Sequence, residues 1–582
     1  MASAYVVEHL NHLGIVAEVC REIGVATWLD QQEPGNRQQV SVGTATVALV
    51  LNGLGFSNRQ LYLVPQFFAD KPVEHLLGPD ILAEDLNDDC LGRTLDWLYE
   101  QDVTRLFAGL ALRARRAFGV AVERLHADTT SFAVHGQYAQ LAAPPPPAAA
   151  GEAVAPWGGQ EGSEGAQGQP AVIEVTYGYS RDHREDLKQW MLALVTSGEG
   201  VPQFLQPLDG NASDKRALLE AVTALTRHLQ DSEETPGVYV ADSGLYSTEN
   251  MTQLNQAGVR WVSRVPEIST AAQAIVQERL EPQEALGQRD GWQTTAEGTR
   301  HWWSREVSEL AQGPERWIVV RTQEGEERAR ATLQRQAERD QTIWEKRLWH
   351  LRHQTFACQP DAEAALAKTC QRLPAWCTVQ SRVTSHPIYP TRGRPRRDAV
   401  PTASVWQIAA TLTRDPVALE REVLRRAAFI IGTNLLDQQA WPDAAVIALY
   451  REQSVAERGF AFLKDPLFLA SSVFVKRPQR IMALAFVMTR CLLVYKLAEV
   501  RVRQQLAATG QTVPDQVRKP TARPTLRWLF QCFEGIDLHH TQHPDGTRVT
   551  EVLRLTAVHR LVLRLLGPAY ENCYFALQQT AE

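Results

Sequence analysis

The spacing of hydrophobic positions divides the chain into a helical beginning, a mixed middle and a helical end. Residues 1–116 carry apolar side chains mainly at the spacing of amphipathic helices, and one such helix is predicted over Leu91 to Leu112. From Gly119 onward, short apolar runs are bounded by glycine and proline, which is typical of strands. The predicted strands cover residues 120–128, 173–177, 190–195, 204–208 and 238–242, with a helix over residues 218–230 before the last one.

More than 200 residues separate Asp242 from Glu457, far more than a connection within one sheet requires. We therefore predict an inserted domain. Strands are predicted over residues 260–265, 302–303, 317–320 and 378–381, and a charged helix over residues 324–346. The core returns with a strand over Phe429 to Asn434. A helix from Asp443 to Lys464 follows, with Pro442 in its first turn, where proline is tolerated.

These elements predict five regions along the chain. Ala142 to Pro170 is rich in proline, alanine, glycine and glutamine, so it is expected to be a loosely ordered excursion from the core. The regions are a helical N-terminal domain over 1–116, the first half of an α/β core over 117–262, an insertion over 263–426, the second half of the core over 427–500, and a helical C-terminal region over 501–582.

The composition favours a folded protein of the cytoplasm. The chain has 582 residues, of which 44% are hydrophobic, so several structural units are expected. The longest apolar run, Ile481 to Tyr495, is interrupted by Thr489 and Arg490 and falls short of a membrane span. No secretion signal is expected from the first residues. The eight cysteines form no Cys-x-x-Cys pair, which favours free thiols, and no nucleotide-binding P-loop occurs.

The net charge of −7 makes the protein as a whole unfavourable for binding DNA. DNA binding would therefore depend on the local distribution of basic residues. Basic residues outnumber acidic ones between Arg458 and Arg527, which predicts a basic strip. A second basic group, residues 392–397, includes Arg394 next to glycine and proline. Such a segment either lies in a narrow minor groove or forms a plain basic loop, which is the commoner case.

Three acidic residues occur in settings that a metal-dependent DNA-cutting site requires. Asp128 lies in a predicted strand beside small polar residues, and Asp242 ends a second strand, where open α/β sheets bind their ligands. Glu457 lies on the predicted helix with Tyr450, Gln453 and Lys464, all within about 60° of one another. An adjacent apolar stripe, formed by Leu449, Ala456, Phe460 and Leu463, would dock this helix.

This pattern resembles the DDE transposases of the IS4/IS1634 insertion-sequence group. In that group the helix of the third carboxylate carries Tyr, Arg, Glu and Lys at the spacing of Tyr450, Gln453, Glu457 and Lys464. Gln453 replaces the arginine, although Arg451 is close in sequence. A second similarity to this group lies in the first half of the core. It covers residues 177–189, with the sequence YGYSRDHREDLKQ, and residues 210–214, with the sequence GNASD.

The resemblance implies an α/β fold with an RNase H-like mixed-sheet catalytic core, interrupted by a large, partly β insertion. It implies a transposase that cleaves transposon ends and transfers the 3′-hydroxyl to target DNA. Asp128, Asp242 and Glu457 would hold two Mg²⁺ ions, for which Mn²⁺ can substitute. Tyr450, Gln453, Arg451, Lys464 and Arg394 would contact DNA. A homodimer on the terminal inverted repeats, in the nucleoid of a prokaryotic cytoplasm and without a membrane, is expected.

Several alternatives stay open from the sequence. The protein could be an RNase H-like nuclease without strand transfer, or an inactive DNA-binding relic. The N-terminal domain could bind DNA ends or support the core. Trp302 and Trp303 are more readily core residues than stacking platforms for an extruded base. The charged helix 324–346 is a solvated or partner-facing surface. His539, His540 and His543 more readily form a solvated loop than a metal site.

Overall fold

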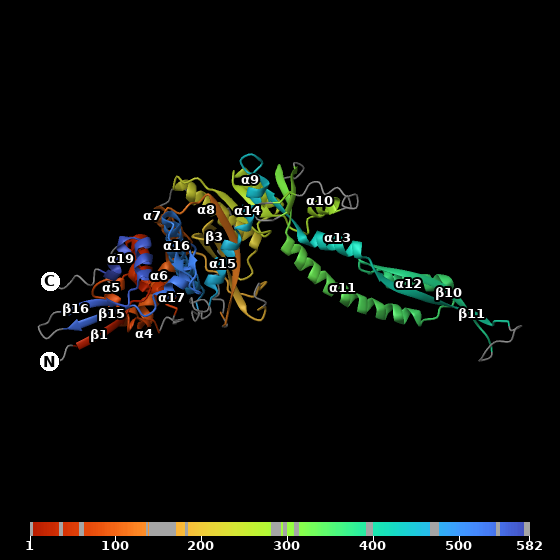
Figure 1. Cartoon of the computed structure of the whole chain (residues 1–582), viewed down its shortest axis with the longest axis horizontal. Helices are drawn as coiled ribbons and strands as arrows, with labels where there is room; N and C mark the ends of the chain where they lie inside the picture. Colours follow the sequence, from red (N-terminus) through yellow and green to blue (C-terminus); the bar gives the residue numbers. More distant parts are fainter. Residues whose placement is uncertain are drawn as a thin grey trace, which may run out of the picture. The chain divides into compact units, whose positions relative to one another are not determined.

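The computed structural model consists of two compact units. Unit 1 contains Met1–Ser263 and Ala448–Glu582, and unit 2 contains Arg264–Ile447 (Figure 1). The structure describes residues 4–33, 39–56, 63–135, 138, 170–180, 184–280, 293–294, 300–307, 313–390, 400–465, 477–542 and 548–575. Arg394, His543 and nearly all of the expected excursion 142–170 therefore lie outside the described residues.

Unit 1 contains a mixed sheet, as the sequence predicts. Its strands lie in the order β4-β3-β2-β5-β6, in which β4, β3 and β2 are antiparallel while β2, β5 and β6 are parallel. The strands are β2 (Arg124–Val134), β3 (Lys188–Ser197), β4 (Pro202–Leu208), β5 (Val238–Ala241) and β6 (Arg260–Arg264). Nearly every residue of β2, β3 and β5 is buried, as expected for strands covered on both faces.

Three of the helices that contact this sheet or connect its strands lie near the residues of interest. Helix α8 (Asp214–Asp231) contacts β2, β3 and β4 through a buried stripe that includes Leu218, Leu225 and Leu229. Helix α9 (Thr248–Gln256) connects β5 to β6, and the Ser247 side chain accepts a hydrogen bond from its first turn. Helix α15 (Ser454–Leu463) contacts β2 and β3.

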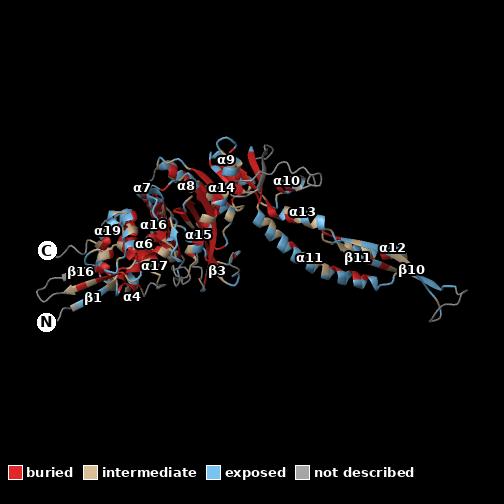
Figure 2. Cartoon of the chain, in the orientation of Figure 1, coloured by how far each residue is buried: buried red, intermediate tan, exposed pale blue. Residues whose placement is uncertain are grey.

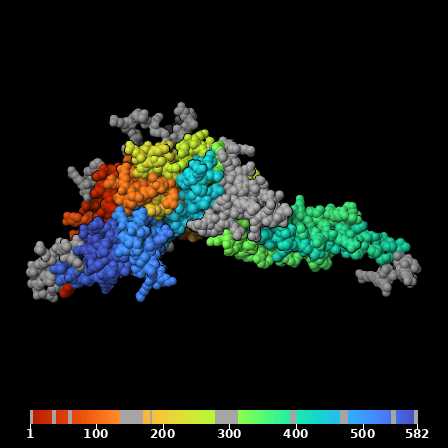
Figure 3. All heavy atoms as spheres, turned by 45° about the horizontal axis from the view of Figure 1, so that its top comes forward, coloured from red at the N-terminus to blue at the C-terminus, as the bar shows by residue number. Residues whose placement is uncertain are grey.

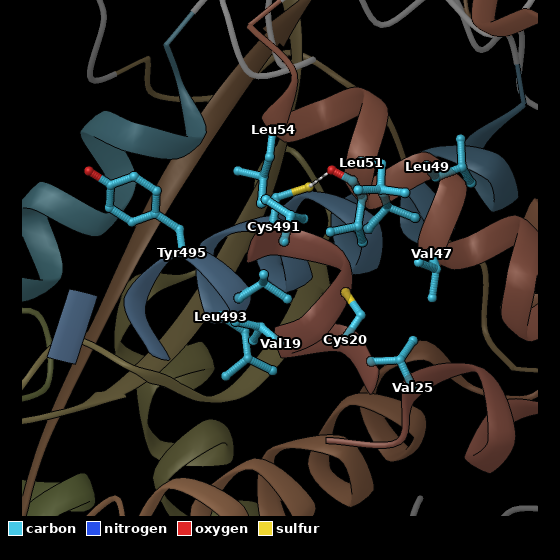
Figure 4. Packing of buried hydrophobic residues seen from close by; sticks show 14 of the residues in the cluster. Val19, Cys20, Val25, Val47, Leu49, Leu51, Leu54, Cys491, Leu493 and Tyr495 are labelled. Carbon is cyan, nitrogen blue, oxygen red and sulfur yellow. Dashed lines mark hydrogen bonds between the residues drawn. The ribbon is translucent and has the colours of Figure 1, made fainter. Parts of the chain in front are cut away.

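The rest of unit 1 is a helical region in which the two ends of the chain share one hydrophobic core (Figures 2 and 4). The N-terminal helices are α1 (Leu13–Glu22), α2 (Val25–Gln31), α3 (Val42–Leu54), α4 (Val64–Phe68), α5 (Val73–Leu77), the short η2 (Ala83–Leu86), α6 (Asp88–Glu100) and α7 (Val103–Phe118). The C-terminal helices are α16 (Pro478–Thr509), α17 (Leu526–Cys532), α18 (Ala557–Leu566) and α19 (Pro568–Phe575).

Helix α16 is long and apolar enough to cross a membrane, but 94% of its most apolar window is buried inside the protein. It contacts α1, α3, α6 and α7 as well as α18. Proline in its first turn and Gly510 in the left-handed conformation (φ 63°) mark its two ends. Its apolar composition therefore belongs to a core helix, as Ile481 and Leu492 at 0% exposure show.

The two chain ends also form a small antiparallel sheet, β1-β15-β16 (Figure 1). Its strands are β1 (Ala4–His9), β15 (Asp537–Gln542) and β16 (Arg548–Leu553). The prediction of a solvated loop at His539 and His540 is wrong, because both residues lie in β15. The His540 imidazole is buried and bonds Glu8 and Thr550, both at 2.8 Å. A two-stranded ladder, β13 (Val513–Pro514) with β14 (Pro520–Thr521), lies between α16 and α17.

Unit 2 combines an antiparallel sheet with long helices and a ribbon. The sheet order is β12-β9-β8-β7, and β10 pairs with β11 in a separate two-stranded ribbon. The elements are α10 (Thr270–Leu280), β7 (Gln293–Thr294), β8 (Arg300–Val307), β9 (Glu315–Arg321), α11 (Gln323–Arg352), α12 (Gln359–Cys370), β10 (Cys377–Ile388), β11 (Ala403–Arg414), α13 (Pro416–Ala427) and β12 (Ala428–Thr433). Helix α11 packs on α13 and β11.

Three sequence predictions of local structure need correction. The helix predicted from Asp443 to Lys464 is two helices, α14 (Asp443–Arg451) and α15, and the segment between them is tightened by bonds from Gln453 N to Tyr450 O and from Val455 N to Glu452 O. The helix predicted over Leu91 to Leu112 is divided between α6 and α7. The strand predicted over residues 173–177 is only an isolated bridge between Thr176 and Gln189.

Candidate active site

Asp128 lies in the middle of β2 with only 7% of its surface exposed. Side chains alternate along a strand, so His126, Asp128 and Phe132 share one face while Thr129 points to the other. The Thr129 hydroxyl bonds Asp214 of α8 at 2.7 Å, which assigns α8 to the face opposite Asp128. One oxygen of the Asp128 carboxylate accepts a hydrogen bond from Thr129 N at 2.7 Å.

Asp242 follows β5 directly and is the register neighbour of Asp128. The parallel strands β2 and β5 pair Ala127 with Ala241, so the next residues of both strands are the two aspartates. Parallel strands lie about 4.8 Å apart, and residues in register point to the same face. The Asp242 carboxylate accepts a hydrogen bond from Gly244 N at 2.8 Å, which fixes it in the turn. The fold thus places one predicted carboxylate in the middle of β2 and the other directly after the end of the adjacent strand β5.

Helix α15 lies along the face of β2 that carries Asp128. Glu452, just before the helix, bonds Arg124 at 2.6 Å, and Lys464, just after it, lies 5.8 Å from the centre of the Phe132 ring. Between these ends, a Cβ at Gly459 would come within 4.0 Å of Leu194, the cross-strand partner of Asp128. The helix therefore spans the level of Asp128, and Figure 1 shows α15 beside β3.

Glu457 lies in the first turn of α15, between these two anchored ends. The predicted apolar stripe is confirmed, because Leu449, Ala456, Phe460 and Leu463 are all buried. Glu457 itself is exposed, which leaves its carboxylate free of the packing that docks the helix. A carboxylate in the first turn also interacts favourably with the positive end of the helix dipole.

The surrounding predicted DNA contacts differ in exposure. Arg451 is exposed, while Tyr450 and Lys464 are partly buried. Gln453 is 8% exposed and lies in the tightened turn between α14 and α15, so a phosphate contact there would require the turn to change. Among the described residues, no three acidic, histidine or cysteine side chains converge closely enough to form a complete metal cluster. Asp128 and Asp242 come next in the register of β2 and β5, and α15, the helix that carries Glu457, contacts β2 and β3.

Sequence reasoning missed the ion pair between Arg124 and Glu452. His126 lies 3.9 Å from the same carboxylate, but burial and the nearby Arg124 lower the pKa of His126 to about 4. The imidazole is therefore neutral near pH 7, and Arg124 is the cation that pairs with Glu452. Burial raises the pKa of Glu452 despite this partner. The two residues are 328 positions apart, so only the folded chain reveals the pair.

Six of the 13 basic residues expected to form a strip between Arg458 and Arg527 are buried or held in internal ion pairs. Lys496 and Arg503 both pair with the buried Glu499, at 2.8 and 2.9 Å. Arg490 is fully buried. Three further pairs join Arg480 to Asp96, Arg501 to Glu22 and Arg527 to Asp465. The excess of positive charge in the sequence is thus not a continuous free surface in this unit.

Two family models match the chain. One describes the transposase DDE domain and matches residues 128–494, which is more than half of the 582 residues. The other describes a domain of unknown function, DUF4277, and matches residues 5–112. A search of curated proteins gave no match. The first match begins at Asp128 and includes both Asp242 and Glu457.

The mixed sheet, with Asp128 in β2 and Asp242 directly after the adjacent β5, is consistent with an RNase H-like fold, so the fold class predicted from the sequence is confirmed. The chain belongs to the transposase DDE domain family. Membership makes it a transposase whose substrate is DNA.

Proposed function

We propose that the protein is a transposase of the IS4/IS1634 group that cleaves the ends of its element and joins the freed 3′-hydroxyl to target DNA. The observation that supports this most directly is the register of β2 and β5, which makes Asp128 and Asp242 neighbours. Helix α15, which carries Glu457, lies on the same face. The order of the three carboxylates along the chain also matches that of the group.

The donor chemistry of this site fits Mg²⁺. Carboxylate oxygens are the ligands that Mg²⁺ prefers, and the ion keeps several waters while it shares its remaining positions with phosphate. Asp128 and Asp242 would hold ions between them, and Glu457 would complete the set. When bound, two such ions activate the attacking hydroxyl and stabilise the leaving oxygen of an in-line displacement. Mn²⁺ has the same ligand preference and is expected to substitute.

The chain's own residues would position the DNA around this site. Arg451 is exposed at the end of α14, and Lys464 follows α15, so both can reach phosphates beside the scissile bond. Tyr450 can donate a hydrogen bond from its hydroxyl. Joining two ends of one element requires both to be held together, so we propose a homodimer assembled on the terminal inverted repeats.

A strand-transfer experiment tests this function. DNA fragments that carry the sequences flanking the gene are incubated with the full chain, Mg²⁺ and a plasmid target. We expect nicking at the fragment ends and covalent joining of their 3′-hydroxyls to the plasmid. Cleavage without any joined product would identify a nuclease instead, and binding without cleavage would identify an inactive relic.

The ion pair between Arg124 and Glu452 provides a test of how α15 is held over the sheet. We expect Arg124→Glu to slow cleavage about tenfold, because two carboxylates would repel where the helix begins. Changes to residues that position metal ligands typically cost about 10- to 100-fold in activity. Glu452→Arg should have a similar effect. Cleavage rates at several Mg²⁺ concentrations measure the change.

The double variant Arg124→Glu/Glu452→Arg serves as the control, because it restores opposite charges across the same contact. We expect it to recover most of the wild-type rate. If the double variant is as slow as the slower single variant, the charge pair does not position α15, and each residue acts separately.

A further inference from the structure

Helix α11 of unit 2 docks on its neighbours through one narrow stripe. Its buried residues are Leu333, Ala337, Trp344, Leu348 and Leu351, which recur at steps of three, four or seven positions and so share one side of the helix. Leu333 and Ala337 join one small hydrophobic cluster, and Leu348 and Leu351 join another, with residues of α12, α13 and the ribbon β10-β11. The opposite side of this 30-residue helix therefore faces solvent, and the exposed residues of α11 are coloured pale blue in Figure 2.

Basic and neutral polar residues, together with one tryptophan, follow a single line along this solvent face. At 100° per residue they fall within an arc of about 100° and recur at alternating steps of four and three. The line consists of Arg328, Thr332, Arg335, Arg339, Thr342, Lys346, Trp349 and His353, and all eight residues are exposed. From Arg328 to His353 it contains no carboxylate, because Glu327, Glu338 and Glu345 lie on the flank. The alternating charges of the sequence are thus separated onto different sides of the helix.

The cations at the centre of this line are not used inside the protein. Among the described residues, Arg335, Arg339 and Lys346 have no ion-pair partner, and Arg335 only donates to the carbonyl of Ala331, one turn earlier. Arg328 has a loose contact of 3.9 Å with Glu324, and both side chains are more than 80% exposed. By contrast, Arg330, which lies off the line, pairs with Glu420 at 2.6 Å.

An exposed aromatic side chain lies at the far end of the line. Trp349 is 52% exposed, and its ring lies 4.2 Å from that of His353. A half-exposed tryptophan beside free cations is suited to stacking or to apolar contact with sugars and bases. Helix packing does not require it, because the stripe that docks α11 is on the other side.

We propose that this face of α11, the line from Arg328 to His353, binds the phosphate backbone of duplex DNA. Its 25-residue span corresponds to about 37 Å at 1.5 Å per residue, close to one turn of the duplex. Exposed arginines and a lysine in a row can contact successive phosphates of the DNA backbone, and such contacts do not depend on the base sequence. The choice of DNA as the partner rests on the proposed function. The surface of α11 is green in Figure 3.

The test compares two triple variants of equal charge in the full chain. Arg335→Gln/Arg339→Gln/Lys346→Gln removes the centre of the line. Lys368→Gln/Arg372→Gln/Arg421→Gln removes three exposed cations elsewhere in unit 2. Binding of the element's terminal DNA is measured by fluorescence anisotropy in EDTA over a range of salt concentrations. We expect the first variant to bind about tenfold more weakly and to lose about two to three from its log–log salt slope, while the second stays near wild type.

Equal affinities and salt slopes for both triple variants would overturn the proposal and leave an acidic protein surface as the partner of this face. DNA cleavage in Mn²⁺ is measured in parallel, so that failure of the α11 proposal can be distinguished from failure of the proposed function. If wild type binds and cleaves DNA while both variants bind alike, only the role of α11 fails. If wild type neither binds nor cleaves any terminal DNA, the proposed function itself fails.

Discussion

Asp128→Asn, Asp242→Asn and Glu457→Gln are each expected to lower metal-dependent DNA cleavage by about 10³-fold or more. Each substitution removes one ligand charge with little change in volume, and a bound metal supplies several kcal/mol of transition-state stabilisation in such reactions. Binding of terminal DNA in EDTA should stay close to wild type, because the phosphates are held by other residues. Cleavage rates in Mg²⁺ and Mn²⁺, with circular dichroism to monitor folding, measure the effect.

Asp214→Asn is a matched control for these variants. Asp214 bonds Thr129, the residue next to Asp128, but it lies on the opposite face of β2. The asparagine oxygen can still accept that bond, so cleavage should fall by less than about threefold. A loss as large as that of Asp128→Asn would show that general damage to β2, rather than loss of a metal ligand, explains the result. Substantial cleavage by any of the three carboxylate variants would remove that residue from the site.

Arg490→Met is expected to stabilise the protein. The Arg490 side chain is fully buried in α16, and its three nitrogens have no hydrogen-bond partner among the described residues. It rests on the Phe486 ring at 4.6 Å. Burial raises the pKa of the nearby Cys20 to about 12, so this thiol provides no negative charge (Cys20 is labelled in Figure 4). Methionine would fill much of the same volume without a buried charge.

The pH dependence of this gain follows from the direction of the pKa change. Burial lowers the pKa of Arg490 from its ordinary 12.5 to about 10. The folded state thus disfavours the charged form, and the cost is fully present at every pH below about 10, with an upper limit of about 3 kcal/mol. The increase in the thermal unfolding midpoint of Arg490→Met relative to wild type should therefore be constant from pH 6 to 9 and diminish only above pH 10.

Arg480→Met, a substitution on the same helix, is expected to lower the stability of the protein instead of raising it. Arg480 forms two hydrogen bonds of 2.7 Å with Asp96, and this partner lowers the pKa of the carboxyl. Removing Arg480 leaves that carboxylate without its partner, so a small loss of stability is expected. If Arg490→Met lowers the unfolding midpoint as much as Arg480→Met does, the buried guanidinium has a stabilising partner that the described residues do not reveal.

The sheet could be predicted from the sequence because its strands are nearly continuous buried runs. β3, β5 and β12 were each recognisable in this way, and so was the amphipathic α8. The division between α6 and α7 was missed because the helical period continues across it. Asp102, which caps α7 through Thr104 N and has a positive φ of 63°, was the available signal.

The candidate site was only partly predictable for a different reason. Local context identifies Asp128 and Asp242, because each comes with a strand, but their adjacency depends on the register of two strands more than 100 residues apart. The break between α14 and α15 coincides with a tertiary contact, because Glu452 in this segment forms an ion pair with Arg124 on β2. Similarly, the sequence shows an excess of basic residues in α16 but not the internal carboxylates, such as Glu499, that neutralise it.

The central claim, that Asp128, Asp242 and Glu457 form one metal site, is tested most directly by counting bound ions. Mn²⁺ titration of the full chain with terminal DNA, followed by electron paramagnetic resonance, reports the number of sites and their affinities. We predict two bound ions per chain for wild type, weakened or lost in Asp128→Asn, Asp242→Asn and Glu457→Gln and retained in Asp214→Asn. Unchanged Mn²⁺ binding in all three carboxylate variants would contradict the claim.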